Sequence, residues 1–327
     1  MCETRGHQAT ETVPVRETAM TVSSRRFAER SGAVPFSFEV YPPRTPDATA
    51  ALHESVERLA DAGPRFISVT FGAGGSTGGR SLELLQHIRE STDVEPLAHL
   101  TCVGHTTARA EALVREFLDA GIDRFLALRG DPPAGLGEDD AFRGELTRAA
   151  DLVRLIRRVR AERGIHDGPG APDIAVAAFP NGHPRARHAH HDVDVLLEKQ
   201  AAGATFAITQ VVFRADDHLA FAERARRAGV HIPIVPGIMP VTSPARLRRV
   251  LELTGEREPT DLALDLELAP DADARREVGV AHAARLARAL LEGGASGIHL
   301  YAFNVHDTVL AVLREAGIPT HEKETAR

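Results

Sequence analysis

Short apolar runs alternate with longer amphipathic segments along most of the chain. The runs are rich in Val, Ile and Phe and stand between turn-forming residues, a pattern typical of buried strands. Most begin about 30 residues after the one before, which is the length of a strand–helix unit. The predicted strands are Val34–Tyr41, Arg65–Gly72, Glu95–Val103, Arg124–Asp131, Asp173–Pro180, Thr205–Phe213, Ile232–Pro240 and Gly297–Asn304.

The segments between these runs have the periodicity of helices. ATAALHESVERLADAG, ARAEALVREFLDAG and HLAFAERARRAG each place apolar residues at positions i, i+3 and i+4 and end at a glycine suited to a helix C-terminus. A helix followed by Ala-Gly and then a strand recurs, which favours a parallel α/β sheet. The recurring pairs are Ala62–Gly63, Ala120–Gly121, Ala202–Gly203 and Ala228–Gly229.

Eight strand–helix units favour closure into a (β/α)₈ barrel, and a doubly wound sheet of the same elements is the alternative. Glu256–Arg275 is longer and more acidic than a connector requires, so an extra helix or lid is expected there, before the last barrel helix. Since composition does not change along the body, one catalytic domain is predicted over residues 33–318. Flexible tails are predicted over 1–32 and 319–327.

Composition and charge exclude several classes of function. A formal net charge of −7 argues against a nucleic-acid surface, and the absence of Trp argues against a base-stacking platform. Cys2 and Cys102 form no CxxC pair, which favours a reducing, cytoplasmic location. The N-terminal segment has no apolar core of a signal peptide, and no run reaches the roughly 18 apolar residues of a membrane span.

In a (β/α)₈ barrel, catalytic residues gather at the carboxyl ends of the strands. Glu39 is the strongest candidate, because a carboxylate between Phe38 and Val40 is costly to bury unless it is paired or functional. The alternative is that Glu39 pairs with Arg129 or a lysine to close the barrel mouth. Other polar residues near strand ends are Thr70, His99, Thr101, Arg129, Gly130, Asp131, Asn181, His183, Gln210, Tyr301 and Asn304.

Two further motifs invite a ligand but have simpler explanations. GAGGSTGGR (Gly72–Arg80) fits no nucleotide-binding pattern, so a turn followed by a helix start is favoured over a phosphate cradle. HPRARHAHHD (His183–Asp192) holds several histidines, but without HExxH a solvated loop, or one histidine facing an anion, is favoured over zinc. No metal site is predicted.

The order of several motifs resembles the methylenetetrahydrofolate reductase family in its bacterial type. The resemblance covers roughly residues 34–316, and its FxFExxPPR and LRGDxP blocks are specific. It implies a (β/α)₈ barrel, in agreement with the strand count. The motifs are FSFEVYPPRT (Phe36–Thr45), SVTFGAGGST (Ser68–Thr77), HLTC (His99–Cys102), ALRGDPP (Ala127–Pro133), AITQVVF (Ala207–Phe213) and VPGIMP (Val235–Pro240).

The resemblance implies that the chain reduces 5,10-methylenetetrahydrofolate. Glu39 matches the general acid that protonates N10 and opens the ring to a 5-iminium cation, and burial is expected to raise its pKa. Asp131 matches the aspartate that stabilises this cation and hydrogen-bonds the pterin. Gln210 matches a pterin-binding amide, and Tyr301 is also expected at the substrate.

The family normally carries FAD as a hydride relay from NADH or NADPH. The positions that match flavin contacts are Thr70, His99, Arg129, Gly130, Asp131, His183, Asp192 and Lys199. Five others depart: Phe179 stands where a Tyr is usual, Val195 replaces an Asn, Glu198 replaces a basic residue, Arg143 occupies a small-residue position, and Val305 stands where an Arg often follows Asn304.

These departures leave two versions open. Either FAD binds and relays hydride, or the flavin is lost and reduced nicotinamide delivers hydride directly to the iminium carbon. Two other functions also stay open, a barrel lyase or aldolase using Glu39 and the histidine loop, and a non-catalytic folate-binding protein. Retention of both Glu39 and Asp131 speaks against the last. The choice of nicotinamide and the oligomeric state are not predicted.

Overall fold

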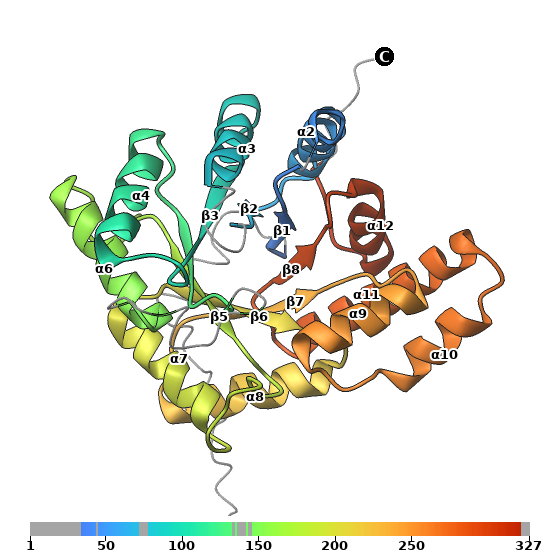
Figure 1. The fold of residues 1–327 in the computed structure, drawn as a ribbon. Coiled ribbons are helices and arrows are strands. Elements are labelled where there is room, and N and C mark those ends of the chain that lie inside the picture. Colours follow the sequence, from blue (N-terminus) through green and yellow to red (C-terminus); the bar gives the residue numbers. More distant parts are fainter. Residues whose placement is uncertain are drawn as a thin grey trace, which may run out of the picture.

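The strands form a closed, parallel barrel at the centre of the molecule (Figure 1). The computed structural model describes residues 34–43, 45–71, 78–132, 135, 142 and 146–321. The strands are neighbours in chain order, and β8 pairs with β1 to close the barrel. They are β1 (Phe36–Val40), β2 (Phe66–Val69), β3 (Glu95–Thr101), β4 (Phe125–Leu128), β5 (Ile174–Ala178), β6 (Phe206–Val211), β7 (Ile234–Ile238) and β8 (Ile298–Tyr301). The predicted barrel is confirmed, and each strand lies within a predicted run.

Helices surround the barrel and cover the outer face of its strands (Figure 1). Side-chain caps fix several helix starts: Thr106 accepts a hydrogen bond from the backbone of Arg109, and Ser243 from that of Arg246. The described helices are α2 (Pro46–Asp61), α3 (Gly78–Ser91), α4 (Thr107–Asp119), α6 (Ala149–Glu162), α7 (His191–Ala202), α8 (Ala215–Ala228), α9 (Pro244–Thr254), α10 (Thr260–Leu268), α11 (Ala272–Glu292) and α12 (His306–Ala316).

The recurring Ala-Gly pairs end helices as predicted. Their glycines have φ angles of 78°, 77°, 112° and 105° at Gly63, Gly121, Gly203 and Gly229. These angles lie in the left-handed region, which a residue with a Cβ adopts at a cost. Each glycine therefore ends one helix and turns the chain toward the next strand.

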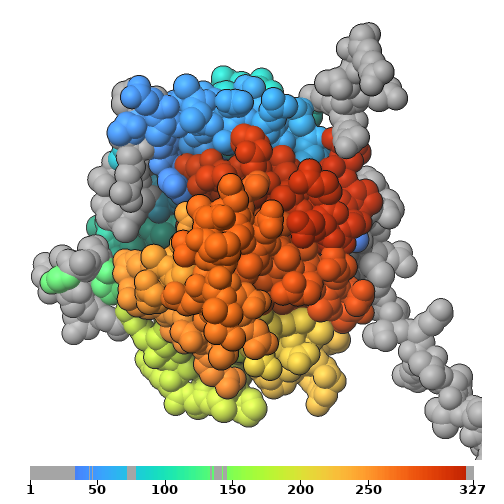
Figure 2. Space-filling view, turned by 90° about the vertical axis from the view of Figure 1, so that its right-hand side faces the viewer, coloured from blue at the N-terminus to red at the C-terminus, as the bar shows by residue number. Residues whose placement is uncertain are grey.

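The connection between β7 and β8 carries the extra helix predicted within Glu256–Arg275. α10 lies between α9 and α11 and packs Leu262 and Leu266 against them, while Leu264 and Leu268 remain exposed. Figure 2 looks onto this side of the molecule, where the orange α9–α11 region lies beside the red C-terminal helix. No helix in the described part of the chain is both long and apolar enough to cross a membrane.

The barrel interior follows the two-residue alternation of its strands. Along each strand, every second residue points inward, where the apolar ones pack into an inner cluster. The residues between them point outward and face the helices. On β1, Phe36, Phe38 and Val40 belong to the outer core, which leaves Ser37 and Glu39 facing inward. The inner cluster consists of Phe66, Leu97, Leu126, Ala175, Phe206, Ile208 and Val235.

A polar cluster joins four strands at the amino-terminal end of the barrel. The Asp173 carboxylate lies 3.3 Å from Arg65 and 3.2 Å from Arg124, and it accepts a hydrogen bond from Thr205 at 3.1 Å. These residues precede β5, β2, β4 and β6 respectively. The cluster therefore ties together the strand ends that lie opposite the predicted site.

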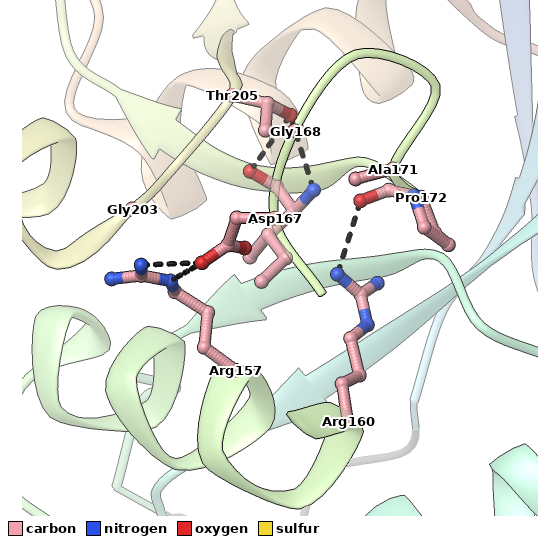
Figure 3. A pocket seen from close by; sticks show the side chains of 9 residues that line it. Arg157, Arg160, Asp167, Gly168, Ala171, Pro172, Gly203 and Thr205 are labelled. Atoms are coloured by element: carbon pink, nitrogen blue, oxygen red, sulfur yellow. Dashed lines mark hydrogen bonds and ion pairs between the residues drawn. The ribbon is translucent and has the colours of Figure 1, made fainter. Parts of the chain in front are cut away.

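A cavity of about 160 Å³ lies beside this cluster (Figure 3). Arg157 and Arg160 reach into it from α6, and Arg157 is bound to Asp167 (Figure 3). Arg160 donates to the backbone oxygens of Pro172 and Asp173. The cavity lies at the amino-terminal end of the barrel and is therefore distant from the chemistry predicted at the carboxyl ends of the strands. The guanidinium groups that line it already bind Asp167 and backbone oxygens.

The predicted tails fall largely outside the described residues and remain predictions.

Candidate active site

Glu39 lies at the carboxyl end of β1 between two imidazoles. Its Oε2 is 3.5 Å from Nε2 of His99 on β3 and 3.6 Å from Nε2 of His299 on β8. These lengths are at or beyond the limit of a hydrogen bond, and each contact is an ion pair only when its imidazole is protonated. Arg129, the partner considered from the sequence, instead donates to the Thr147 oxygen at 3.3 Å. Glu39 therefore faces histidines, not a guanidinium.

The pKa of Glu39 corrects the expectation from sequence. Burial is the largest single influence and pushes the pKa of the carboxyl upward, as expected. His99 and His299 together outweigh that effect and hold the pKa below its usual value. Burial also lowers the pKa of His99, in opposition to the pull of Glu39. The carboxyl and the imidazoles thus compete for protons inside the barrel.

Tyr301 lies beside Glu39 on the neighbouring strand, where the two residues are in register. Its hydroxyl donates to the backbone oxygen of Thr209 at 3.0 Å, and burial followed by the Glu39 charge raises its pKa well above the usual value. The ring fills the space left by Gly237 on β7, where an added Cβ would lie 2.7 Å from the ring. Tyr301 therefore stays protonated, and its side chain packs from β8 against β6 and β7.

Gln210 lies at the end of β6, next to an irregularity in the pairing with β7. Its side-chain oxygen accepts a hydrogen bond from the backbone nitrogen of Val211 at 2.9 Å. Thr70 follows β2, where its nitrogen donates to the Val40 oxygen at 3.0 Å and its oxygen accepts from Ser81 at 3.1 Å. Both residues therefore lie at the barrel end that carries Glu39.

A second group of predicted residues gathers around His183, in the loop between β5 and α7. Both carboxylate oxygens of Asp192 accept from the His183 backbone nitrogen at 3.2 Å. Burial lowers the pKa of His183, while Asp192 and Asp131 act to raise it and Arg129 acts to lower it. Asp131 and Arg129, which follow β4, thus lie within electrostatic range of this imidazole, and Gly130 connects them with a φ of 78°.

Lys199 completes this group from α7. Its Nζ donates to the Ala177 oxygen on β5 at 2.8 Å. Burial lowers its pKa to about 8, although Asp192 and Glu198 act in the opposite direction. Since parallel strands all end on the same side of a barrel, both groups lie on the carboxyl-terminal face. The described contacts link residues within each group and give no direct contact between Glu39 and Asp131.

The positions that depart from the family pattern have local partners. Phe179 packs edge-on against His183, with ring centroids 4.6 Å apart. Glu198 lies 2.6 Å from the guanidinium of Arg148, which offsets the negative charge that the sequence places on α7. Val195 is half-buried on the same helix. Arg143 lies outside the described residues.

His299 and Ser37 are not among the residues predicted from sequence. His299 is fully buried, and its Nδ1 lies 2.8 Å from Ser37 Oγ. The available signal was the alternation along the strands, because residue 299 shares the inward face with Tyr301, and Ser37 shares it with Glu39. The sequence alternation could therefore have identified His299 as an interior partner of the Glu39 carboxyl.

The histidine loop has contacts of its own, and the Gly-rich turn lies largely outside the described residues, which resume at Gly78. His188 and His191 pack edge-on, and His188 lies 3.9 Å from the exposed Asp194. Among the described residues, no three or more His, Cys, Asp or Glu side chains group closely enough to hold a metal ion.

Comparison with known proteins agrees with this arrangement. The family model described as methylenetetrahydrofolate reductase matches residues 24–317. The chain belongs to the methylenetetrahydrofolate reductase family. It is 34% identical to the 5,10-methylenetetrahydrofolate reductase of Salmonella typhimurium, over 90% of this chain and 95% of that protein. It is 32% identical to methylenetetrahydrofolate reductase (NADH) 1 of Arabidopsis thaliana, over 89% of this chain and 50% of that protein.

A solved structure supports the fold of this family member. An uncharacterized protein from Clostridium thermocellum, described as binding two copies of 5-methyl-5,6,7,8-tetrahydrofolic acid, aligns with a TM-score of 0.60. The alignment covers 90% of this chain and 98% of that protein at 14% sequence identity. At this identity the likeness extends to the barrel and no further.

Proposed function

We propose that this chain reduces 5,10-methylenetetrahydrofolate to 5-methyltetrahydrofolate with NADH or NADPH as reductant. The observation that carries the proposal is the placement of Glu39, an inward carboxyl at the mouth of the barrel with imidazoles on two sides. Family membership supplies the substrate class. A buried acid at the barrel mouth supplies the chemistry that this substrate needs.

The first step requires a proton on N10 of the folate. Glu39 gives the proton from its carboxyl oxygen to N10, and the bond between N10 and the one-carbon unit breaks to leave a 5-iminium cation. A pterin bound over the barrel mouth excludes water from Glu39, and this extra desolvation acts to raise the pKa of the carboxyl. Substrate binding therefore favours the protonated form that the free site disfavours.

The second step places a hydride on the carbon of the iminium group, which becomes the methyl group. Asp131 is the anion that faces the positive charge, and its carboxylate lowers the energy of the cation without reacting with it. Its side chain is exposed after β4, so a substrate can reach it directly. Gln210 and Tyr301 border the same face and are proposed to contact the pterin.

Asp131→Asn is expected to lower kcat for methylenetetrahydrofolate reduction by about 100-fold, because the amide keeps the shape but loses the charge that stabilises the cation. Steady-state kinetics under anaerobic conditions measures the change. Asp216→Asn, on an exposed residue in the first turn of α8, is the matched control and should leave kcat unchanged. Equal rates for the two variants would remove Asp131 from the mechanism.

FAD is proposed as the hydride carrier, and the residues present fit its charge. Arg129 and Lys199 supply positive groups, His183 lies within electrostatic range of Arg129 and Asp192, and Arg148 offsets the charge of Glu198. Thr70, His99, Gly130 and Asp131 are the other residues that would hold it. When bound, FAD would supply hydride transfer from the nicotinamide to the folate. Direct transfer from the nicotinamide is the alternative.

The reaction itself is tested by anaerobic mixing of the purified protein with methylenetetrahydrofolate and NADH or NADPH, with and without added FAD. Formation of 5-methyltetrahydrofolate supports the proposed function, and its absence under every condition contradicts it. The visible spectrum of the freshly purified protein tests the cofactor. Flavin absorption bands are expected, and an active but colourless protein would rule out the FAD version.

A further inference from the structure

A buried histidine lies beneath Glu39 and has no route to a bound ligand. His299 is 0% exposed, and its ring lies between Phe66, at a centroid distance of 5.9 Å, and Tyr301, at 5.2 Å. Its Nε2 has no hydrogen-bond partner and faces Glu39 Oε2. Any influence of His299 on the reaction must therefore pass through Glu39.

The second ring nitrogen of His299 determines what the first can offer. Nδ1 lies 2.8 Å from Ser37 Oγ, and a serine hydroxyl can either donate or accept there. When Ser37 donates to Nδ1, Nε2 carries the hydrogen and meets an ionised Glu39. When Nδ1 carries the hydrogen, Nε2 is an acceptor that suits a protonated Glu39. The His299–Ser37 pair can therefore suit both the ionised and the protonated form of Glu39.

His99 differs from His299 in its surroundings although it contacts the same oxygen. It is 6% exposed on β3, and it matches a flavin-contacting position of the family. Its effect on Glu39 is therefore open to change when a ligand binds. His299 is enclosed on the opposite side of the carboxyl and keeps its place whether or not the mouth is occupied.

We propose that His299 is a positioning residue for Glu39. Ser37 orients the imidazole of His299, and this imidazole holds the Glu39 carboxyl from the barrel interior and sets the pH range over which Glu39 donates its proton. This inference rests on the proposed function of Glu39 as the general acid. It assigns the interior of the barrel, and not only its rim, a part in the reaction.

The direction of the pH effect follows from the groups that face Glu39. Among the described residues these are His99 on β3 and His299 and Tyr301 on β8. Removal of His299 leaves burial, which raises the pKa, opposed only by His99. The pKa of Glu39 should then rise. Because the protonated carboxyl is the active form, the loss of activity at high pH should move to higher pH.

The test is the pH profile of kcat for His299→Phe, Ser37→Ala and the wild-type protein. We expect the alkaline limb to move upward by about one pH unit in His299→Phe, since loss of a donor that favours the ionised carboxyl raises the pKa of that carboxyl. Ser37→Ala should move it less, in the same direction. Ser55→Ala is the control, because Ser55 is also buried but lies on α2, where it donates to the Asn304 oxygen, and its limb should stay in place.

An unmoved or downward-shifted limb in a folded His299→Phe variant would overturn the proposal, whatever its effect on the rate. If that variant does not fold, Ser37→Ala decides in the same way. A merely structural histidine would lower stability or kcat at all pH values alike. It would not move the limb.

A measurement without turnover separates this inference from the proposed function. In protein labelled with ¹⁵N-histidine, the ring-nitrogen signal that Ser37→Ala perturbs should change with pH in the wild type and lose that change in Glu39→Gln. If the protein reduces no methylenetetrahydrofolate, the proposed function fails, but this coupling still appears. A signal that titrates identically in both proteins would show that His299 and Glu39 are uncoupled.

Discussion

Glu39→Gln is expected to lower the turnover of methylenetetrahydrofolate by about 10²- to 10⁴-fold, the usual contribution of a general acid. The amide has the shape of the carboxyl and can still contact His99 and His299. This amide has no acidic proton to give to N10, so the ring of the substrate stays closed. Folate affinity should change little, because the substitution removes a reaction step rather than a binding surface.

Anaerobic kinetics and a folate-binding titration measure these two outcomes separately. Glu95→Gln is the matched control, because Glu95 lies on barrel strand β3 but at its amino-terminal end, where it pairs with Arg124 at 3.2 Å. That variant should retain wild-type turnover. Near-normal turnover in Glu39→Gln would show that another group protonates the folate.

Asp173→Ala is expected to lower the free energy of unfolding by about 3 kcal/mol or more, because it removes the carboxylate from a partly buried ionic cluster. Arg65 and Arg124 would lose the group that offsets their charges, and Thr205 would lose its acceptor. Four strands begin at this cluster, so the loss should affect the whole barrel. Chemical denaturation followed by circular dichroism measures the difference.

Asp167→Ala provides the comparison, since it removes the same group from an exposed ion pair with Arg157. Such pairs contribute about 0–1 kcal/mol, so this variant should unfold almost as the wild type does. Equal losses for the two variants would contradict a stabilising role for the Asp173 cluster. Because the cluster lies opposite Glu39, the activity of folded Asp173→Ala protein should be unchanged.

The barrel could be predicted from local patterns. Strand alternation and helix periodicity depend on residues only a few positions apart, and the Ala-Gly pairs mark helix ends by a backbone angle that few other residues adopt. The extra helix within Glu256–Arg275 was indicated by the length of the connection. These features need no knowledge of distant contacts.

The electrostatics of the site could not be predicted in the same way. The pKa of Glu39 was expected to rise because its chain neighbours, Phe38 and Val40, are apolar. Its partners His99 and His299 are far away in sequence, and His299 meets it only because β8 pairs with β1. Glu198 was likewise interpreted without Arg148, which approaches from another helix. Charge balance depends on non-local contacts.

The strand order also has a consequence for biosynthesis. Glu39 lies on the first strand to leave the ribosome, whereas His299 and Tyr301 lie on the last. A nascent chain therefore carries this carboxyl through the synthesis of the six intervening strands without its interior neighbours. The acid acquires its final environment only when β8 pairs with β1, which makes synthesis of the last barrel strand a condition for catalysis.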